Sequence, residues 1–180
     1  MDIKFSNGYR KHIEQCINLN KICYGNTGVT VKSRLPDPLD TKYENLYIVL
    51  DNDKVVGYID FQLCDYTKGK IISILKQYGI EGKTLLYLDS VCVLPEYRSY
   101  GIATKLTNLV LSKNSADIIA AEVVKPPNEP MAVSSKILKS LGFKELVTIE
   151  DSWTQYMKNH KLSCNFCGSE CHCAGVLFVK

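Results

Sequence analysis

Apolar residues recur along this chain of 180 residues with two periods, one typical of strands and the other of helices. Nearly continuous apolar runs at residues 84–93 and 118–124 predict strands that are covered on both faces. Shorter apolar or alternating runs predict further strands, and residues 51–54 read as the turn of a hairpin. These further strands are expected at residues 1–5, 46–50, 55–63, 143–150 and 152–158, the last two as an antiparallel pair.

Helical spacing marks several segments between these strands. Ile102, Leu106 and Val110 recur at i, i+4 and i+8 after Gly101, which predicts a helix with one face on a sheet. Further helices are expected after Ser6-Asn7 and from a cap at Asn128 to Gly142. Residues 70–80 are ambiguous: their spacing favours a helix, but their isoleucines also suit a strand. The glycines and prolines of residues 25–42 predict an irregular segment. This order of elements predicts a mixed α/β sheet flanked by helices.

Composition narrows the class of protein. An apolar content of 46% is typical of a globular domain, and a net charge of +3 with a pI near 8.3 does not indicate nucleic acid binding. No apolar run reaches the roughly 18 residues of a membrane helix, and the first residues have no apolar signal core. We therefore expect a soluble cytoplasmic protein with no membrane partner, and nothing in the sequence sets its oligomeric state.

The distinctive stretch of the chain is residues 88–106, LDSVCVLPEYRSYGIATKL. It predicts a strand, a turn and then a helix. Arg98 to Ala103 fit the pattern Arg/Gln-x-x-Gly-x-Gly/Ala at such a junction, where free backbone N–H groups and the positive helix end converge on an anion. Gly101 permits close approach of the backbone, and Arg98 adds a fixed positive charge. A pyrophosphate is the ligand expected at this turn.

With its preceding strand, Val91-Cys92-Val93-Leu94-Pro95-Glu96-Tyr97-Arg98, this junction resembles the GNAT superfamily of acetyl-coenzyme A-dependent N-acetyltransferases. The pair Gly142-Phe143 resembles the end of a later helix in that family. The resemblance covers about residues 1–160 and implies a mostly antiparallel sheet, acetyl-coenzyme A as co-substrate and an amine as acceptor. It also implies the coenzyme-binding residues, which are Val91, Cys92, Val93, Arg98, Ser99, Tyr100, Gly101, Ile102, Ala103 and Asn128.

Two carboxylates are candidates for deprotonating the amine. Asp89 interrupts the apolar strand, where spermidine/spermine acetyltransferases carry a strand carboxylate. An Asp that only binds a backbone group or an arginine is the alternative. Glu122, in the other apolar strand, is the second candidate, and it equally fits a solvent-facing side chain. Cys92 is interpreted as a packed core thiol, not a nucleophile, because no histidine lies on a neighbouring predicted strand.

The family's general acid is missing. Many members carry a Tyr four residues before the Gly-Phe, where this chain has Leu138, and counting from Asn128 gives Ser135 instead. Water, Tyr97 or Tyr100 then remain as proton donors, and backbone N–H groups near Cys92 and Val93 as oxyanion donors if the strand bulges there. A catalytically weak or inactive interaction protein, binding a partner through its tail, is therefore the alternative to an acetyltransferase.

The tail, residues 161–180, is expected as a small unit separate from the acetyltransferase domain at 1–160. Its Cys-x-x-Cys-Gly motif, at Cys164 to Gly168, resembles a zinc knuckle, and Cys171 and Cys173 complete four thiolates. His172 is an alternative ligand, and disulfides are the alternative chemistry, which a cytoplasmic location disfavours. The spacing favours a structural zinc ion over an iron–sulfur cluster.

Overall fold

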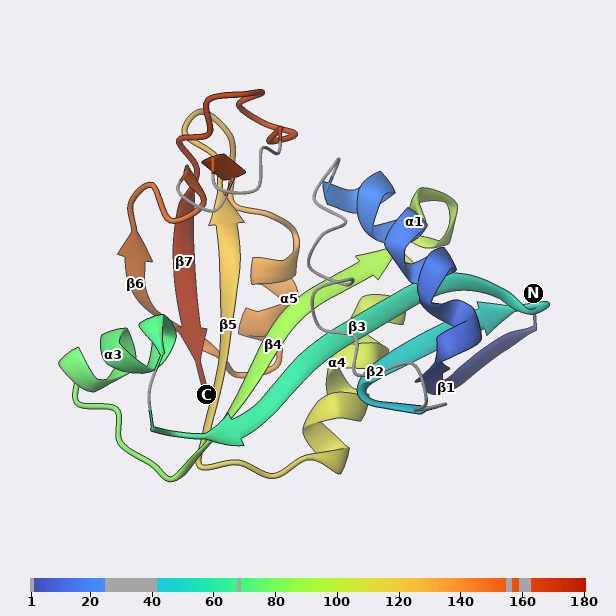
Figure 1. Ribbon diagram of the computed structural model, residues 1–180, viewed down its shortest axis with the longest axis horizontal. Helices are drawn as coiled ribbons and strands as arrows, with labels where there is room; N and C mark the ends of the chain where they lie inside the picture. The colour runs from blue at the N-terminus through green and yellow to red at the C-terminus, as the bar shows by residue number, and fades with distance from the viewer. Residues whose placement is uncertain (1, 25–41, 68, 155–156, 159–162) are drawn as a thin grey trace.

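The computed structural model of the protein describes residues 2–24, 42–67, 69–154, 157–158 and 163–180. Within these residues seven strands form one sheet in the order β1-β2-β3-β4-β5-β7-β6 (Figure 1). All neighbouring strands are antiparallel except the parallel pair β4 and β5, so the predicted mixed, mostly antiparallel α/β sheet is confirmed. The strands are β1 (Ile3–Tyr9), β2 (Lys42–Asp51), β3 (Lys54–Asp65), β4 (Thr84–Val93), β5 (Ile118–Lys125), β6 (Lys144–Ile149) and β7 (Ala174–Val179).

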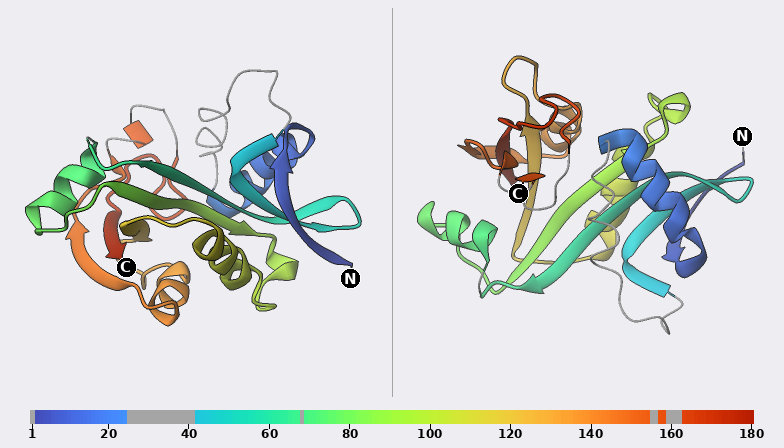
Figure 2. Two further views of the ribbon diagram at one scale, coloured as in Figure 1. Left: turned by 90° about the horizontal axis from the view of Figure 1, so that it is seen from below. Right: turned by 45° about the horizontal axis from the view of Figure 1, so that its top comes forward.

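Helices cover both faces of the sheet. In the view from below, α1 lies on one side of the central strands, and α4 and α5 lie on the other (Figure 2). No helix in the described part of the chain is long and apolar enough to cross a membrane. The helices are η1 (Arg10–His12), α1 (Ile13–Tyr24), α3 (Lys70–Gln77), η2 (Pro95–Tyr97), α4 (Ile102–Lys113) and α5 (Ser134–Ser140).

The face of α4 predicted from the sequence does pack on the sheet. Ile102, Leu106 and Val110 are at most 3% exposed, and α4 contacts β2, β3 and β4. Gly57 on β3 permits this approach, because an added Cβ would lie 3.1 Å from the Cγ2 atom of Ile102. Truncating the fully buried Leu106 to alanine would cost about 2–5 kcal/mol of unfolding free energy. The helix that begins at the conspicuous turn is thus fixed firmly to the strand that precedes it.

The parallel ladder between β4 and β5 is short, so the two strands separate beyond it. The ladder runs only from Leu85 opposite Ile118 to Leu88 opposite Ala121, while the other edge of β5 pairs with β7 from Ala120 to Lys125 (Figure 1). Asp117 fixes the closed end, where its Oδ2 atom accepts hydrogen bonds from the backbone N–H groups of Lys83 and Thr84 at 2.7 and 3.0 Å. These bonds lower the pKa of Asp117. From Leu88 and Ala121 onward, the facing edges of β4 and β5 separate into a V.

The end of the chain differs from the sequence-based expectation. The described residues of the segment 152–158 do not form the predicted strand: Ser152 and Trp153 lie in a turn, and the Met157 N–H donates to the Trp153 carbonyl as in a helix. The partner of β6 is β7, which lies between β5 and β6. The strand after the Cys-rich stretch therefore belongs to the central sheet, although residues 161–180 were expected as a separate tail. Its almost fully buried sequence AGVLFV explains the preference for this position.

Two predicted helix starts are also wrong. β1 continues through Ser6-Asn7, which pair with β2, so α1 begins only at Ile13. After β5 the chain turns back and the Ala132 N–H donates to the Val124 carbonyl, so α5 begins at Ser134 and Asn128 does not cap it. The predicted helix over 70–80 is confirmed by α3. The segment 25–42 was expected to be irregular, and its residues 25–41 lie outside the described residues.

Candidate functional site

Two adjoining pockets occupy the V between β4 and β5. They share Tyr24, Asp89, Ser90, Glu122, Val123 and Ser134. The first pocket extends between the strands and helices α4 and α5, and its other lining residues are Ile59, Leu88, Val91, Thr107, Ala121, Ile137 and Leu138. The second extends toward the end of α1 and the Cys-rich stretch, and its other lining residues are Asn20, Cys23, Val124, Ala132, Trp153, Met157, Cys164, Asn165, Phe166, Cys171 and Cys173.

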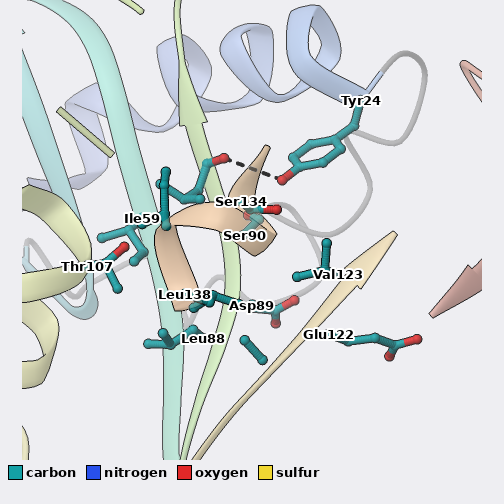
Figure 3. Close-up of a pocket in the computed structure, with 13 residues that line it drawn as sticks. Tyr24, Ile59, Leu88, Asp89, Ser90, Thr107, Glu122, Val123, Ser134 and Leu138 are labelled. Carbon is teal, nitrogen blue, oxygen red and sulfur yellow. Dashed lines mark hydrogen bonds between the residues drawn. The ribbon is translucent and has the colours of Figure 1, made fainter. Parts of the chain in front are cut away.

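Asp89 lies where the two strands part. Phe61 of β3 pairs with Leu88 and Asp60 with Ser90, so Asp89 is the extra residue of a β-bulge. Its half-buried carboxylate accepts a hydrogen bond at 3.1 Å from the Gln62 side-chain amide. The side chain lines both pockets (Figure 3). The bulge that would have freed backbone N–H groups near Cys92 and Val93 thus lies at Asp89 instead and coincides with the candidate base.

Glu122 occupies the equivalent place on the other arm, directly after the last ladder residue Ala121. Its Oε1 atom accepts a hydrogen bond from the Ser152 hydroxyl. The carboxylate lies over Gly175 of β7, where any Cβ would collide with it. In Figure 3 the Glu122 carboxylate points away from Asp89. The fold therefore brings both predicted carboxylates to the V but directs Glu122 toward β7.

The predicted anion-binding turn connects η2 to α4. Ser99 and Gly101 have φ angles of 68° and 72°, so two left-handed residues fold the turn around the start of the helix. Ser99 and Tyr100 are exposed, whereas Ile102 is buried in the core and Ala103 is half-buried. The first N–H groups of α4 have no helical partner, as at every helix start. Asn128 is exposed in the turn after β5 and belongs to the lining of neither pocket.

Past the bulge, β4 presents one unpaired edge. The Leu94 N–H donates to the Val56 carbonyl of β3, and strand alternation therefore directs the backbone groups of Cys92 toward β3 as well. Val91 and Val93 face the other way: their carbonyls accept hydrogen bonds from the Tyr24 hydroxyl at 3.4 Å and from the Cys23 thiol at 3.7 Å. The backbone donors available at the V are thus those of Val91 and Val93, not Cys92.

A thiol pair lies between the end of α1 and β4. Cys23 lies close to Cys92, and the Arg98 guanidinium contacts Cys23 at 3.8 Å and the Val93 carbonyl at 3.1 Å. The pKa of Cys23 is lowered to about 6, chiefly by Cys92, with Arg98 acting in the same direction and burial opposing both. Burial raises the pKa of Cys92, which is 1% exposed, in agreement with a packed core thiol.

The sequence reasoning missed Tyr24. This residue ends α1, and its hydroxyl reaches the Val91 carbonyl inside the first pocket (Figure 3). Burial and the neighbouring thiols of Cys92 and Cys23 raise its pKa well above the ordinary value, so the hydroxyl keeps its proton at neutral pH. Leu138, at the position of the missing tyrosine, lines the same pocket. Tyr97 instead donates to Asp51 at 2.8 Å, and Tyr100 is 60% exposed.

A network of buried polar side chains adjoins the second pocket. The Asn20 amide donates to the Tyr58 hydroxyl at 2.6 Å, and the Ser90 hydroxyl contacts both Tyr58 and Asp60. Asn20 and Tyr58 are at most 1% exposed. Buried polar groups that satisfy one another hold a unique arrangement, because each unpaired member would be costly. The network therefore fixes α1 relative to the bulge of β4.

The four tail cysteines come together within one cluster. Their sulfur atoms all lie within 4.8 Å of one another, and Cys164, Cys171 and Cys173 are buried. His172, the alternative ligand, instead has its Nδ1 atom 3.5 Å from the Asp151 carboxylate at the surface. All four cysteines are free thiols and lie beside Trp153 and Met157. The predicted cysteine set is thus assembled as a potential metal-binding cluster.

Comparison with known proteins agrees with this geometry. No curated protein sequence matches the chain. Among solved structures, Arabidopsis thaliana NAA60 in complex with acetyl-CoA has a TM-score of 0.70 at 16% identity, covering 99% of this chain and 97% of that one. Drosophila melanogaster polyamine N-acetyltransferase has a TM-score of 0.66 at 13% identity, covering 99% of each chain. A mosquito arylalkylamine N-acetyltransferase-like protein has a TM-score of 0.60 at 14% identity, covering 99% of each chain.

These structural similarities show the fold alone, because each identity is low. The family model described as acetyltransferase (GNAT) family matches residues 13–132, which is more than half of the chain. The matched region begins with α1 and includes both arms of the V and the turn before α4. The chain therefore belongs to the acetyltransferase (GNAT) family.

Proposed function

We propose that the protein transfers an acetyl group directly from acetyl-coenzyme A to a primary amine. The observation that carries this proposal is the V between β4 and β5, which holds Asp89 at its apex and opens into two pockets. In this proposal the coenzyme reaches the V from the α4 side through the first pocket, and the amine enters through the second. A direct reaction then takes place where the pockets meet, beside Asp89.

The coenzyme binds along a continuous path in this proposal. Its pyrophosphate lies against the N–H groups at Arg98 to Ala103, since a helix start with left-handed residues suits an anion. Its pantetheine arm runs along the unpaired edge of β4, whose Val91 and Val93 backbone groups are directed toward the V. Thr107 of α4 and Val91 of β4 line the first pocket together with Asp89, so the arm would enter the pocket between α4 and the β4 edge.

Asp89 accepts the proton of the amine. A lysine-like amine has a pKa of about 10.4, so deprotonation at pH 7 costs about 4.6 kcal/mol, and a nearby base lowers that barrier. The neutral nitrogen attacks the thioester carbonyl, and the C–N bond forms. The oxyanion of the tetrahedral intermediate takes hydrogen bonds from backbone N–H groups of the β4 edge. Glu122 is the second candidate base.

Collapse of the intermediate breaks the C–S bond and releases a thiolate, which needs a proton. We assign this role to Tyr24, because its hydroxyl lies in the V and holds its proton at neutral pH. The tyrosinate formed is reprotonated from solvent, and Asp89 loses its proton to solvent. Leu138 then marks a change in the position of the acid, and does not by itself indicate an inactive protein.

The acceptor is a primary amine of a small molecule, a polyamine or a protein. Release of free thiol from acetyl-coenzyme A, followed together with the mass of the acetylated product, tests the proposal on a panel of these amines. Acetylated product with stoichiometric thiol supports it. Coenzyme binding without turnover on every amine contradicts it and favours the alternative of an interaction protein. A cytoplasmic location stays a prediction.

We also propose that Cys164, Cys167, Cys171 and Cys173 bind one structural zinc ion. The set offers four thiolates within one cluster, and a closed tetrahedron leaves no position for water or substrate. The metal therefore takes no part in the chemistry of acetyl transfer.

A further inference from the structure

We propose that the zinc centre of the Cys-rich stretch builds one wall of the amine pocket, so that metal occupancy sets acceptor binding without affecting coenzyme binding. This inference rests on the proposed acetyl transfer. It assigns Phe166, in the loop between the first two cysteines, as a contact for an apolar group of the acceptor. The Cys-rich stretch is then a specificity element of the enzyme, and not an appendage beside it.

The cysteines have the geometry of a preformed metal knuckle. The Sγ atom of Cys173 lies 3.6 Å from that of Cys164 and 3.4 Å from that of Cys167. A tetrahedral zinc ion with Zn–S bonds of about 2.3 Å separates its sulfurs by about 3.8 Å, whereas a disulfide needs about 2.05 Å. The observed spacing is therefore close to that of a shared metal ion and too long for a disulfide.

The backbone of the loop between Cys164 and Gly168 also suits a metal-binding knuckle. Cys164 and Gly168 exchange two backbone hydrogen bonds, at 2.7 and 2.9 Å, which close a tight loop between them. Gly168 has a φ angle of 75°, a conformation that favours glycine. The Phe166 N–H is 3.4 Å from the Cys164 sulfur and donates to it, which stabilises a thiolate. The tight turn and the N–H directed at its sulfur thus prepare Cys164 as a ligand.

The same loop reaches the pocket. Asn165 and Phe166 line the second pocket together with three of the cysteines, Cys164, Cys171 and Cys173. Phe166 is 48% exposed, so its ring is not needed for the core. On the opposite side this pocket is lined by Asp89 of β4 and Cys23 of α1. A loop held by the metal therefore faces the candidate base across the proposed amine site.

The wall is also joined to the sheet. Cys173 directly precedes β7, whose first residue Ala174 pairs with Lys125 of β5. The Thr154 hydroxyl donates to the Cys171 carbonyl, and this ties the cysteine cluster to the turn that carries Trp153. Without metal, four thiols must pack together with no shared ligand, and the loop is held only by its backbone and side-chain hydrogen bonds. The coenzyme turn at Arg98 to Ala103 shares no residue with this wall.

The wall predicts the chemistry of the acceptor. Among the described residues that line the pocket, the carboxylates are Asp89 and Glu122 on the strand side, whereas the opposite wall offers Phe166, Trp153 and Met157. An amine that places its nitrogen at Asp89 thus directs its remaining part toward aromatic and apolar side chains. We expect an amine with an aromatic or aliphatic group, such as 2-phenylethylamine, to bind better than putrescine, whose far end is charged.

Zinc removal is the first test. Protein purified under reducing conditions should contain one zinc ion per chain. Trp153 is the single tryptophan of the chain and packs against the cysteine cluster, so its fluorescence should change on chelation and return when zinc is added. The zinc-free protein should bind acetyl-coenzyme A within about twofold of the parent, whereas its KM for 2-phenylethylamine should rise at least about tenfold.

Phe166→Ala is the second test, because it leaves every metal ligand in place. Tyr78→Ala is the matched control: Tyr78 is 50% exposed at the end of α3 and lines neither pocket. Phe166→Ala should keep one zinc per chain and the parent's coenzyme affinity, and should raise the KM for 2-phenylethylamine about tenfold. The KM for putrescine should change less. Tyr78→Ala should behave as the parent on both amines.

The outcomes separate the two proposals. Absence of stoichiometric zinc overturns the inference. So does a KM for 2-phenylethylamine that neither zinc removal nor Phe166→Ala raises above the KM of the Tyr78→Ala variant. A parent that acetylates no amine contradicts the proposed function instead. Titration of 2-phenylethylamine against Trp153 fluorescence, with and without zinc, needs no turnover and decides in that case whether the metal-held wall binds amines.

Discussion

The proposed coenzyme side and the proposed acceptor side of the V are built in different ways. Arg98 to Ala103 and the helix that follows are one continuous segment, and the left-handed residues Ser99 and Gly101 give it its shape locally. The second pocket is assembled from the end of α1, both arms of the V and the Cys-rich stretch. The turn at Arg98 to Ala103 keeps its conformation through a single local motif. The shape of the second pocket changes when any of several segments that are distant in the sequence changes. Coenzyme binding and acceptor choice can therefore vary separately in this fold.

The largest effect on activity should come from Asp89→Asn, because Asp89 lies where the two pockets meet. Loss of the base should lower kcat at pH 7 by about 100-fold or more, because general base catalysis contributes about that factor. Activity should recover partly as pH rises and more of the amine is already neutral. The pH–rate profile and the acetyl-coenzyme A affinity, which should not change, are measured together.

Asp65→Asn is the control, since Asp65 is an exposed carboxylate at the end of β3. It should leave the profile of the parent intact. Equal pH–rate profiles for Asp89→Asn and the parent remove Asp89 from the mechanism and leave Glu122 as the candidate base.

Gly101→Val should affect the coenzyme side alone. Its Cβ meets no protein atom within 4 Å, so the costs are a strained left-handed backbone, about 1–2 kcal/mol, and obstruction of the coenzyme. Acetyl-coenzyme A affinity, measured by calorimetry, should fall more than about tenfold. Gly79→Val is a close match, since Gly79 has a φ angle of 69° and equally open surroundings but lies after α3.

If both glycine variants lose similar stability and only Gly101→Val loses coenzyme affinity, the turn is the pyrophosphate site. Similar coenzyme affinity in the two variants, with both proteins folded, contradicts that assignment.

Tyr24→Phe should have a smaller effect, because water can replace a proton donor in part. Removing the hydroxyl should lower kcat about tenfold while changing the KM for the amine little. A thioester with a better leaving thiol needs less protonation, so the defect should shrink with such a substrate. A defect of the same size for both thioesters would mean that Tyr24 only positions the β4 edge through the Val91 carbonyl.

The same contrast between local and distant contacts explains what sequence could predict. β4 was predicted with both boundaries correct because its apolar run is long and continuous, and α4 was predicted at its start because a helical stripe begins directly after Gly101. Tyr24 was missed because its proposed role depends on α1 crossing the end of β4, which no local pattern encodes. β7 was missed because its six residues follow the cysteines directly, and its place between β5 and β6 is a tertiary contact.

The smallest expected change concerns Cys23, which lies between the two sides. Its pKa of about 6 makes it mostly thiolate at pH 7, so alkylation by iodoacetamide should follow a midpoint near pH 6. Cys92→Ala removes the main cause of that lowered pKa and should move the midpoint upward, and Arg98→Gln should move it less. Peptide mass spectrometry distinguishes Cys23 from the exposed Cys64. A midpoint that stays near pH 6 in Cys92→Ala would mean that the charge of Arg98, and with it the coenzyme turn, controls this thiol instead.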